Sequence, residues 1–143
     1  MTGSLQQITR VAAYGIIKQN EQVLLCRLSN RVTGSEGKWT LPGGGIDFAE
    51  APAQAMVREI MEETGLSAEA LDVAAVDSGV FEFEEGIRHS IRIIYHTTHV
   101  AGELVFEQGG STDKCQWFSE TEARGLPKVE LAKVGLELAY PQG

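Results

Sequence analysis

The amino-acid sequence predicts a mixed α/β sandwich, and the order of its elements is the main evidence. Two β-rich runs come first, a clear helix follows at residues 52–64, two longer β-rich runs come next, and helical segments close the chain. A regularly wound βαβ sheet would alternate strands and helices throughout. We therefore expect an α/β (α+β) fold in which one helix is inserted between two groups of strands.

The size and charge of the chain limit the classes of protein to which it can belong. Its 143 residues, 43% of them hydrophobic and 22% charged, fit one globular domain over residues 1–143. The net charge of −8 disfavours non-specific binding to nucleic acid or anionic membranes, because both partners reward clustered Lys and Arg. Long nucleic acid is therefore not expected as a partner, and an anionic ligand would need local positive charge or a metal ion.

Targeting and membrane segments are not expected either. The first ten residues, MTGSLQQITR, have no apolar core of signal-peptide length, and no later window approaches the ~18 apolar residues of a membrane span. We therefore expect a cytoplasmic protein without a membrane partner. The sequence leaves the oligomeric state open and allows a homodimer.

The first strands are predicted by β-rich runs at residues 11–18 (VAAYGIIK) and 22–28 (QVLLCRL), joined as a hairpin by a short polar turn. Residues 29–38 are polar and hold two glycines, which is typical of an exposed loop. After Trp39-Thr40-Leu41 come Pro42 and three consecutive glycines. This run predicts a sharp backbone feature rather than a regular element.

Residues 52–64 form the clearest predicted helix. Pro52 suits the first helical position, and Gly65 suits the left-handed residue that follows the last turn. Ala51 is a poor residue for the N-terminal cap, so the start of the helix is less well defined by its side chains.

The second half of the chain predicts more strands and then helices. Long β-rich runs at residues 71–83 and 87–100 flank an acidic turn and predict an antiparallel pair. Shorter strands are expected at residues 104–106 and 115–118. Ser119-Glu120-Thr121-Glu122 has the spacing of a capping box, so we expect a helix there that breaks around residues 125–127 and resumes over 128–140.

Three carboxylates lie near the end of the helix at residues 52–64. Glu59, Glu62 and Glu63 have i, i+3, i+4 spacing, which confines them to an arc of roughly 100° on one face. An apolar stripe is expected on the opposite face, formed by Ala53, Met56, Val57, Ile60 and Thr64. Like charges so close to the negative end of a helix cost about 1 kcal/mol in stability, so a compensating cation is expected.

This acidic face allows two interpretations. It could be a solvated surface, which helical spacing alone favours, or it could be a site for a hard dication. Mg²⁺ and Mn²⁺ take oxygen ligands, and Mg²⁺ typically shares one or two carboxylates with substrate phosphates. The three glycines at residues 43–45 favour the second interpretation, because they leave bare backbone just upstream that can approach a metal or a phosphate.

The stretch from Gly44 to Leu66 resembles the Nudix box, G-x5-E-x7-R-E-U-x-E-E-x-G-U, in which U is a bulky aliphatic residue. All nine constrained positions match, at Gly44, Glu50, Arg58, Glu59, Ile60, Glu62, Glu63, Gly65 and Leu66. The lead-in W-x-L-P-G-G at residues 39–44 and the Trp-containing strand at residues 116–118 are also similar to Nudix domains. The resemblance covers a core of about residues 10–140 and implies an α/β/α sandwich built on a mixed β-sheet.

The resemblance also implies roles for the residues of the box. Glu59 and Glu63 would be the principal metal ligands, with Glu62 as a further ligand or a neighbour of one, and the Gly43 carbonyl as another contact. Arg58 would orient Glu59, Glu50 would brace the loop before the helix, and Gly65 would end the helix. The metal would be Mg²⁺ or Mn²⁺.

The implied reaction is hydrolysis of a nucleoside diphosphate linked to another group, by attack of water at phosphorus. Either a carboxylate would serve as general base or a hydroxide would form on the metal, and the box does not decide between them. A base or a further metal ligand could come from a later loop, in which Glu103, Glu107 and Asp113 are candidates and Glu107 is preferred. Substrate contacts are expected from Arg27, Lys38 and the backbone of Gly44. Arg31, Arg88 and Arg92 are further candidates for phosphate contact, although such residues are more often plain surface. Four aromatic residues could stack on a base but are more often core residues: Phe81, Phe83, Tyr95 and Trp117.

Two classes of function remain open at this point. The first is a metal-dependent hydrolase acting on a nucleoside triphosphate, ADP-ribose or a similar small nucleotide. The second is a binding module of the same fold that senses a nucleotide without cleaving it. The complete box favours the hydrolase, since a binding module would ordinarily carry a damaged one.

Overall fold

The computed structural model describes residues 6–106 and 108–142. The strands are β1 (Gln6–Ile16), β2 (Lys18–Gln19), β3 (Gln22–Leu28), β4 (Trp39–Thr40), β5 (Gly43–Gly45), β6 (Leu66–Phe83), β7 (Gly86–Gly102) and β8 (Thr112–Ser119). The helices are α1 (Pro52–Thr64), α2 (Glu120–Arg124) and α3 (Glu130–Ala139). This order confirms the predicted arrangement of strands, an inserted helix, further strands and closing helices.

The strands form two sheets. One has the order β5-β1-β7-β6, and the other has the order β2-β3-β4 with β8 also paired to β3. β1 runs parallel to β7 but antiparallel to β5, so the first sheet is mixed. The predicted hairpin of β6 and β7 is confirmed and is longer than expected, because pairing extends from Phe83↔Gly86 to Leu66↔Gly102.

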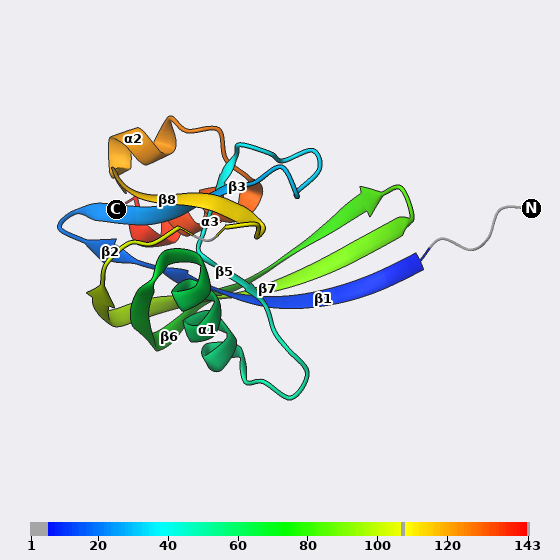
Figure 1. Cartoon of the computed structure of the whole chain (residues 1–143), viewed down its shortest axis with the longest axis horizontal. Coiled ribbons are helices and arrows are strands. Elements are labelled where there is room, and N and C mark those ends of the chain that lie inside the picture. Colours follow the sequence, from blue (N-terminus) through cyan, green and yellow to red (C-terminus); the bar gives the residue numbers. More distant parts are fainter. Residues whose placement is uncertain (1–5, 107, 143) are drawn as a thin grey trace, which may run out of the picture.

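Helices cover opposite sides of the strands, which confirms the α/β/α sandwich (Figure 1). Alternate residues of β1 belong to different cores, as their period of two requires: Ala12 faces one core and Ala13 the other. The first core also contains Leu131 and Leu136 of α3. The second contains three residues of α1, listed here with their strand neighbours: Ala55, Met56, Ile60, Ile17, Leu24, Cys26, Leu66 and Cys115.

The prediction of a strand at residues 104–106 is wrong. These residues lie outside regular structure, because they pass over the end of α1 rather than along a sheet edge. The Val105 N–H donates to the Thr64 carbonyl at 2.8 Å. A Cβ placed on Gly65 would lie 2.8 Å from the Glu103 carbonyl oxygen, which shows how closely the segment covers the helix end.

The C-terminal helices follow their local signals. Ser119 caps α2 by accepting from the Glu122 N–H, while the Glu122 carboxylate accepts from the Ser119 N–H at 2.8 Å. α3 begins at Glu130, two residues later than predicted, because residues 127–129 bond to Trp39 instead: its N–H donates to the Pro127 carbonyl and its carbonyl accepts from Val129. None of the helices in the described part of the chain has the length and apolarity to cross a bilayer.

The distal halves of β6 and β7 form a long hairpin that extends away from the helices, with the start of β1 alongside β7 (Figure 1). We call residues 6–11, 76–83 and 86–92 the arm. Its pairing is continuous, because Gln6 lies opposite Gly86 and Val11 opposite Ile91 in the parallel β1–β7 register. One face of the arm contributes to the site described below.

The packing of α1 gives a testable prediction for stability. Ile60 is fully buried in the core between α1 and the strands, so Ile60→Ala should lower the free energy of unfolding by about 2–5 kcal/mol in a urea titration. Met61 is 47% exposed on the same helix, so Met61→Ala should cost less than about 0.5 kcal/mol. Equal costs for the two variants would contradict the orientation of α1.

Candidate functional site

The helix α1 has the ends that its sequence predicts. Pro52 is the first helical residue, and Gly65 follows the last with a left-handed φ of 76°, its N–H donating to the Met61 carbonyl. Ala51 makes no side-chain cap, as expected. Its backbone N–H donates to Oε1 of the Gln54 side chain at 3.1 Å. The helix end is further fixed by Thr64, whose hydroxyl donates to the Ile60 carbonyl at 2.6 Å.

The three glutamates share one side of α1, but their environments differ. The buried residues of the helix are Ala55, Met56, Ile60, Glu63 and Thr64, so the buried face is rotated from the predicted stripe, and Ala53 and Val57 are only half-buried. Glu63 is 4% exposed, whereas the Glu62 side chain is 49% exposed. The Glu59 side chain lies between these extremes at 20%.

Glu63 is held at the edge of β5. One of its carboxylate oxygens, Oε1, accepts from the Gly43 N–H at 2.8 Å, and this contact is buried. The sequence resemblance implies a role for the Gly43 carbonyl, but the contact with Glu63 uses the amide. A carboxylate that accepts one backbone N–H can accept further donors or a cation, because each of its oxygens has two lone pairs.

The glycines of β5 allow α1 to approach closely. A Cβ on Gly44 would lie 2.7 Å from both Cδ and Oε2 of Glu59, so any side chain there would push the carboxylate away. Gly43 has a φ of 144°, and a Cβ there would lie 2.3 Å from the Ala13 carbonyl oxygen. Both positions therefore require glycine: Gly44 because of the Glu59 carboxylate, and Gly43 because of the backbone of β1.

Arg58 supplies the compensating cation, one turn before the end of the helix. Its Nε and Nη2 donate to the two carboxylate oxygens of Glu50, at 2.8 and 2.9 Å. Its Nη1 donates to Glu59 at 3.0 Å and to Glu62 at 3.3 Å. Its Nη2 also donates to the Gly45 carbonyl at 3.1 Å. One guanidinium thus ties the loop before α1, two of the glutamates and β5 together.

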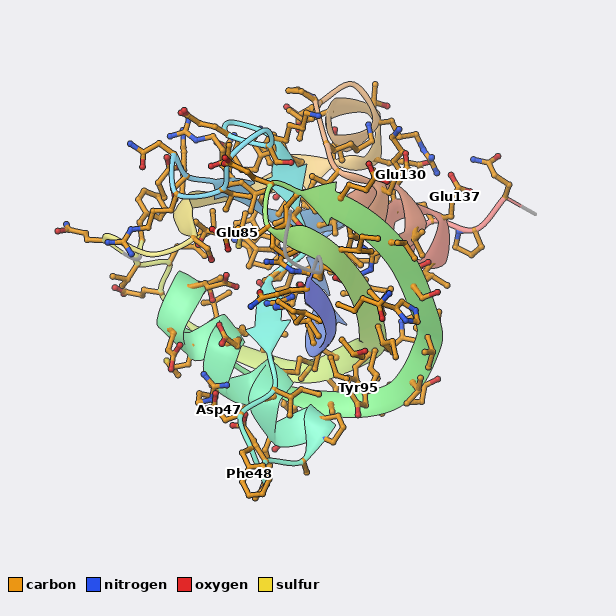
Figure 2. All side chains as sticks on the ribbon, turned by 90° about the vertical axis from the view of Figure 1, so that its right-hand side faces the viewer. Asp47, Phe48, Glu85, Tyr95, Glu130 and Glu137 are labelled. Atoms are coloured by element: carbon orange, nitrogen blue, oxygen red, sulfur yellow. The ribbon has the colours of Figure 1, made fainter. Side chains whose placement is uncertain are left out.

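This network changes the titration of its members. The hydrogen bonds from Arg58, together with the Asp47 N–H, lower the pKa of Glu50 from 4.5 to about 2. The hydrogen bond to Glu50 raises the pKa of Arg58 further above its ordinary value, and Glu62 and Glu59 add to that effect. Glu50 and Arg58 therefore form an ion pair at neutral pH. The tip of the loop that they hold carries Asp47 and the fully exposed Phe48 (Figure 2).

Glu59 and Glu63 line the same cavity, which has a volume of about 410 Å³. The three glycines of β5 form part of its wall. In the described residues, no group of three or more His, Cys, Asp or Glu side chains is close enough to hold a metal ion. Two carboxylates are nevertheless a suitable donor set for Mg²⁺ or Mn²⁺, because Mg²⁺ usually completes its shell with water and substrate phosphate oxygens.

The other predicted site residues are more scattered. Glu62 contacts Arg58 and does not line the cavity. Gly44 lies in the cavity wall, while Lys38 is exposed at the end of the loop before β4. Glu107 lies outside the described residues.

Arg27 lies in a neighbouring cavity of about 600 Å³, together with Arg31 and Asp113. Its Nε donates to Asp113 Oδ1 at 2.8 Å, and both side chains are partly exposed. The two cavities share Leu28 and Thr112 in their walls, so they are adjacent. The structure therefore joins two separately predicted residues, a phosphate-contact candidate and a general-base candidate, in one ion pair.

Sequence reasoning missed one wall of the 410 Å³ cavity. Arg10 was not singled out, and Arg88, Arg92 and Phe81 were considered more often surface or core, yet all four line the cavity. The parallel pairing of β1 with β7 brings the three arginines together, and the antiparallel pairing of β6 with β7 places Phe81 opposite Arg88. The alternation of Arg88, Ser90 and Arg92 along one strand was the available signal, but it gives no information about which strand lies beside it.

The family of the chain follows from a comparison with protein-family models. The model described as the NUDIX domain matches residues 8–137. The chain belongs to the NUDIX family. Among solved structures, this NUDIX chain is similar to a MutT NUDIX hydrolase from Burkholderia pseudomallei, with a TM-score of 0.78 at 25% identity over 91% of this chain and 97% of that one. It is also similar to a MutT protein from Methanosarcina mazei, with a TM-score of 0.75 at 25% identity over 94% of each chain.

Curated relatives of this NUDIX chain carry several names. It is 32% identical to an ADP-ribose pyrophosphatase of Methanocaldococcus jannaschii, over 83% of this chain and 65% of the relative. It is 59% identical to the putative 8-oxo-dGTP diphosphatase 3 of Mycobacterium tuberculosis, over 64% of this chain and 42% of the relative. It is 33% identical to the nucleoside triphosphatase NudI of an Enterobacter species, over 56% of this chain and 60% of the relative. The chain thus spans less than two thirds of the length of each of these relatives.

The ion pair between Glu50 and Arg58 gives this NUDIX chain a pH-dependent stability. A lowered pKa means that the folded state binds fewer protons than the unfolded state, so the contribution of Glu50 is complete above about pH 4.5 and is lost as the pH falls towards 2. We expect Glu50→Gln to lower the melting temperature at pH 7, with a difference from the unaltered chain that shrinks between pH 4.5 and 2. Glu84→Gln, in the exposed turn before β7, is the control. A difference independent of pH would contradict the ion pair.

Proposed function

We propose that this chain is a divalent-metal-dependent hydrolase that cleaves a diphosphate bond in a small nucleotide of the nucleoside diphosphate-X class. One observation carries the proposal: the carboxylates of Glu59 and Glu63 line a single cavity against a strand that has no side chains. The named relatives support it, because they are called a pyrophosphatase, a putative diphosphatase and a triphosphatase.

In this proposal Glu59 and Glu63 hold Mg²⁺ or Mn²⁺, with Glu62 and the Gly43 carbonyl as further candidate ligands. When bound there, the cation supplies positive charge beside the diphosphate and makes water more acidic. Arg58 has a positioning role, since its bond to Glu59 fixes the carboxylate and its bonds to Glu50 fix the loop. Gly44 leaves room for Glu59 and can offer its backbone to the substrate.

Water must lose a proton as it attacks phosphorus, so the reaction needs a base. We retain Glu107 as the preferred general base, with Glu103 and Asp113 as alternatives. The pairing of Asp113 with Arg27 weighs against Asp113, because a carboxylate bound to a guanidinium accepts a proton less readily. Arg27 and Lys38 are the proposed substrate contacts outside the box.

The proposed substrates are a nucleoside triphosphate, ADP-ribose or a similar small nucleotide. One relative is named for ADP-ribose and another for nucleoside triphosphates, so the names of the relatives do not favour either substrate. The net charge of −8 disfavours a long RNA, since binding along a phosphate backbone requires a basic surface.

A second candidate is a non-catalytic module that binds a nucleotide in the same cavity. It would bind the nucleotide in the cavity but would not hydrolyse it, with or without a divalent cation. All nine positions of the box are intact, which favours the hydrolase.

One experiment tests both candidates. Release of phosphate or nucleoside monophosphate is measured with ordinary and oxidised dNTPs, ADP-ribose, dinucleoside polyphosphates and nucleotide sugars, each with Mg²⁺, with Mn²⁺ and with EDTA. Cleavage of one class that EDTA abolishes supports the hydrolase and identifies its substrate. No cleavage anywhere, with a nucleotide still raising the melting temperature, would favour the binding module.

Glu63→Gln should reduce kcat by at least about 100-fold, because an amide oxygen can still accept from Gly43 but carries no charge for a cation. The fold should survive, with an unchanged or slightly higher melting temperature, since the change removes a negative charge near the helix C-terminus. Glu137→Gln, an exposed position of α3 that does not line the cavity (Figure 2), is the matched control and should leave kcat unchanged. Full activity in Glu63→Gln would refute the proposed metal site.

A further inference from the structure

Three arginines lie on one face of the arm. In the parallel pairing of β1 with β7, Arg10 lies opposite Ser90, between the positions opposite Arg88 and Arg92. Side chains two residues apart on a strand point to the same face, and paired residues of neighbouring strands share that face. Arg10, Arg88 and Arg92 therefore project from the same side of the sheet. We call these three residues the arginine wall.

The arginine wall lines the same cavity as the two glutamates. Arg10, Arg88 and Arg92 contribute to one part of the 410 Å³ cavity, and Glu59 and Glu63 contribute to another. The strand β5 lies between the two parts. A Cβ on Gly44 would meet Glu59, while a Cβ on Gly45 would lie 3.4 Å from Nη2 of Arg10. Successive glycines thus face the carboxylate and the guanidinium, and the absence of side chains keeps both parts in one cavity.

Few protein groups neutralise the wall. Among residues 6–106 and 108–142, neither Arg10 nor Arg88 forms an ion pair with a carboxylate: the polar neighbour of Arg10 is the Tyr14 hydroxyl at 3.5 Å, and Arg88 lies 5.7 Å from the Phe83 ring centre. Arg92 is 8% exposed and is paired with Asp77. Its Nε is buried and has no hydrogen-bond partner in the described structure.

A buried donor without a partner costs stability, and so do like charges on neighbouring positions of a sheet. An anionic ligand would relieve both costs, because guanidinium groups bind phosphate and carboxylate oxygens through paired N–H donors. The overall charge of −8 makes this local excess of positive charge more informative, since most of the surface repels anions.

We propose that the arginine wall binds a second anionic group of the substrate, a phosphate or carboxylate that lies beyond the diphosphate cleaved near Glu59 and Glu63. The inference rests on the proposed hydrolase for the position of the diphosphate. It defines the substrate class more narrowly: a nucleotide with an anionic group in addition to the scissile diphosphate. The extra group can come from two sources, the next phosphate of a nucleoside triphosphate or a phosphate on a sugar of a dinucleotide.

A neutral nucleobase fits this wall less well. Phe81 lies beside Arg92, with 5.6 Å between the guanidinium carbon and the ring centre, and could stack on a base. However, one base edge offers acceptors for only one guanidinium in a bidentate contact, and a neutral base would supply no negative charge to balance Arg10 and Arg88. The number of arginines therefore favours an anion.

The first test measures anion binding without catalysis. The dissociation constant of inorganic triphosphate is measured by calorimetry in EDTA for the unaltered chain, Arg88→Ala, Arg88→Lys and Lys133→Ala. Arg88 is exposed, so its variants should fold, and Lys133→Ala removes the same charge from an exposed position of α3 that does not line the cavity. We expect Arg88→Ala to weaken binding roughly tenfold. Arg88→Lys should weaken it less, and Lys133→Ala should have little effect. Equal loss in Arg88→Ala and Lys133→Ala, or no binding at millimolar triphosphate, would overturn the proposal.

The second test uses pairs of nucleotides that differ by one phosphate, dGTP with dGDP and NADP⁺ with NAD⁺, hydrolysed in Mg²⁺. Arg88→Ala should raise KM roughly tenfold for the member of one pair that carries the extra phosphate, and less for the other member. The pair that responds identifies the source of the anion. Equal increases for both members would overturn the proposal and indicate contact with the base. Loss of triphosphate binding in Arg88→Ala, with no hydrolysis of any nucleotide, would refute the hydrolase and leave the anion site standing.

Discussion

The close approach of α1 to the strand β5 is the constraint on which the site depends. The carboxylate of Glu59 lies where a side chain of residue 44 would begin, and the carboxylate of Glu63 bonds to the backbone of residue 43. A Cβ on Gly44 would clash with the Glu59 carboxylate, and a Cβ on Gly43 would clash with the neighbouring strand β1. The apolar face of α1 supplies the force that holds the helix this close, since Met56 and Ile60 are fully buried. The buried packing of α1 therefore fixes the position of both carboxylates.

The cost of this arrangement is electrostatic, and Arg58 offsets it. A last-turn cation would be the usual remedy for acidic residues near a helix C-terminus, but in α1 that turn carries glutamates. Arg58 comes one turn earlier and still reaches Glu62, because side chains at i and i+4 lie on the same face, and it also donates to the adjacent Glu59. Partly exposed ion pairs contribute little stability individually, typically below about 1 kcal/mol. The network is therefore better explained as a device that fixes the direction of Glu59 and the path of the loop.

The parts of this structure that depend on local signals could be predicted from the sequence. Pro52 and Gly65 define the ends of α1, and Ser119 with Glu122 defines the start of α2, because each signal acts within a few residues. The burial of Glu63 could not be predicted, since it depends on how α1 is rotated against β5. The parallel pairing of β1 with β7 was equally inaccessible. It joins residues about 80 positions apart, and no feature of either strand identifies its neighbour.

The two functions proposed for the cavity rest on parts of the fold that differ in how tightly they are packed. The carboxylates lie on a helix whose inner face is fully buried between the layers of the sandwich, where small displacements are costly. The arginine wall lies on the arm, whose outer face includes Val76 and Val80 at 65% and 67% exposure, so fewer packed neighbours hold it. Changes in the arm can alter which substrates are bound without disturbing the packing of α1. Chemistry and recognition are thus supported by different parts of the fold, and the side-chain-free strand β5 is the element where they meet.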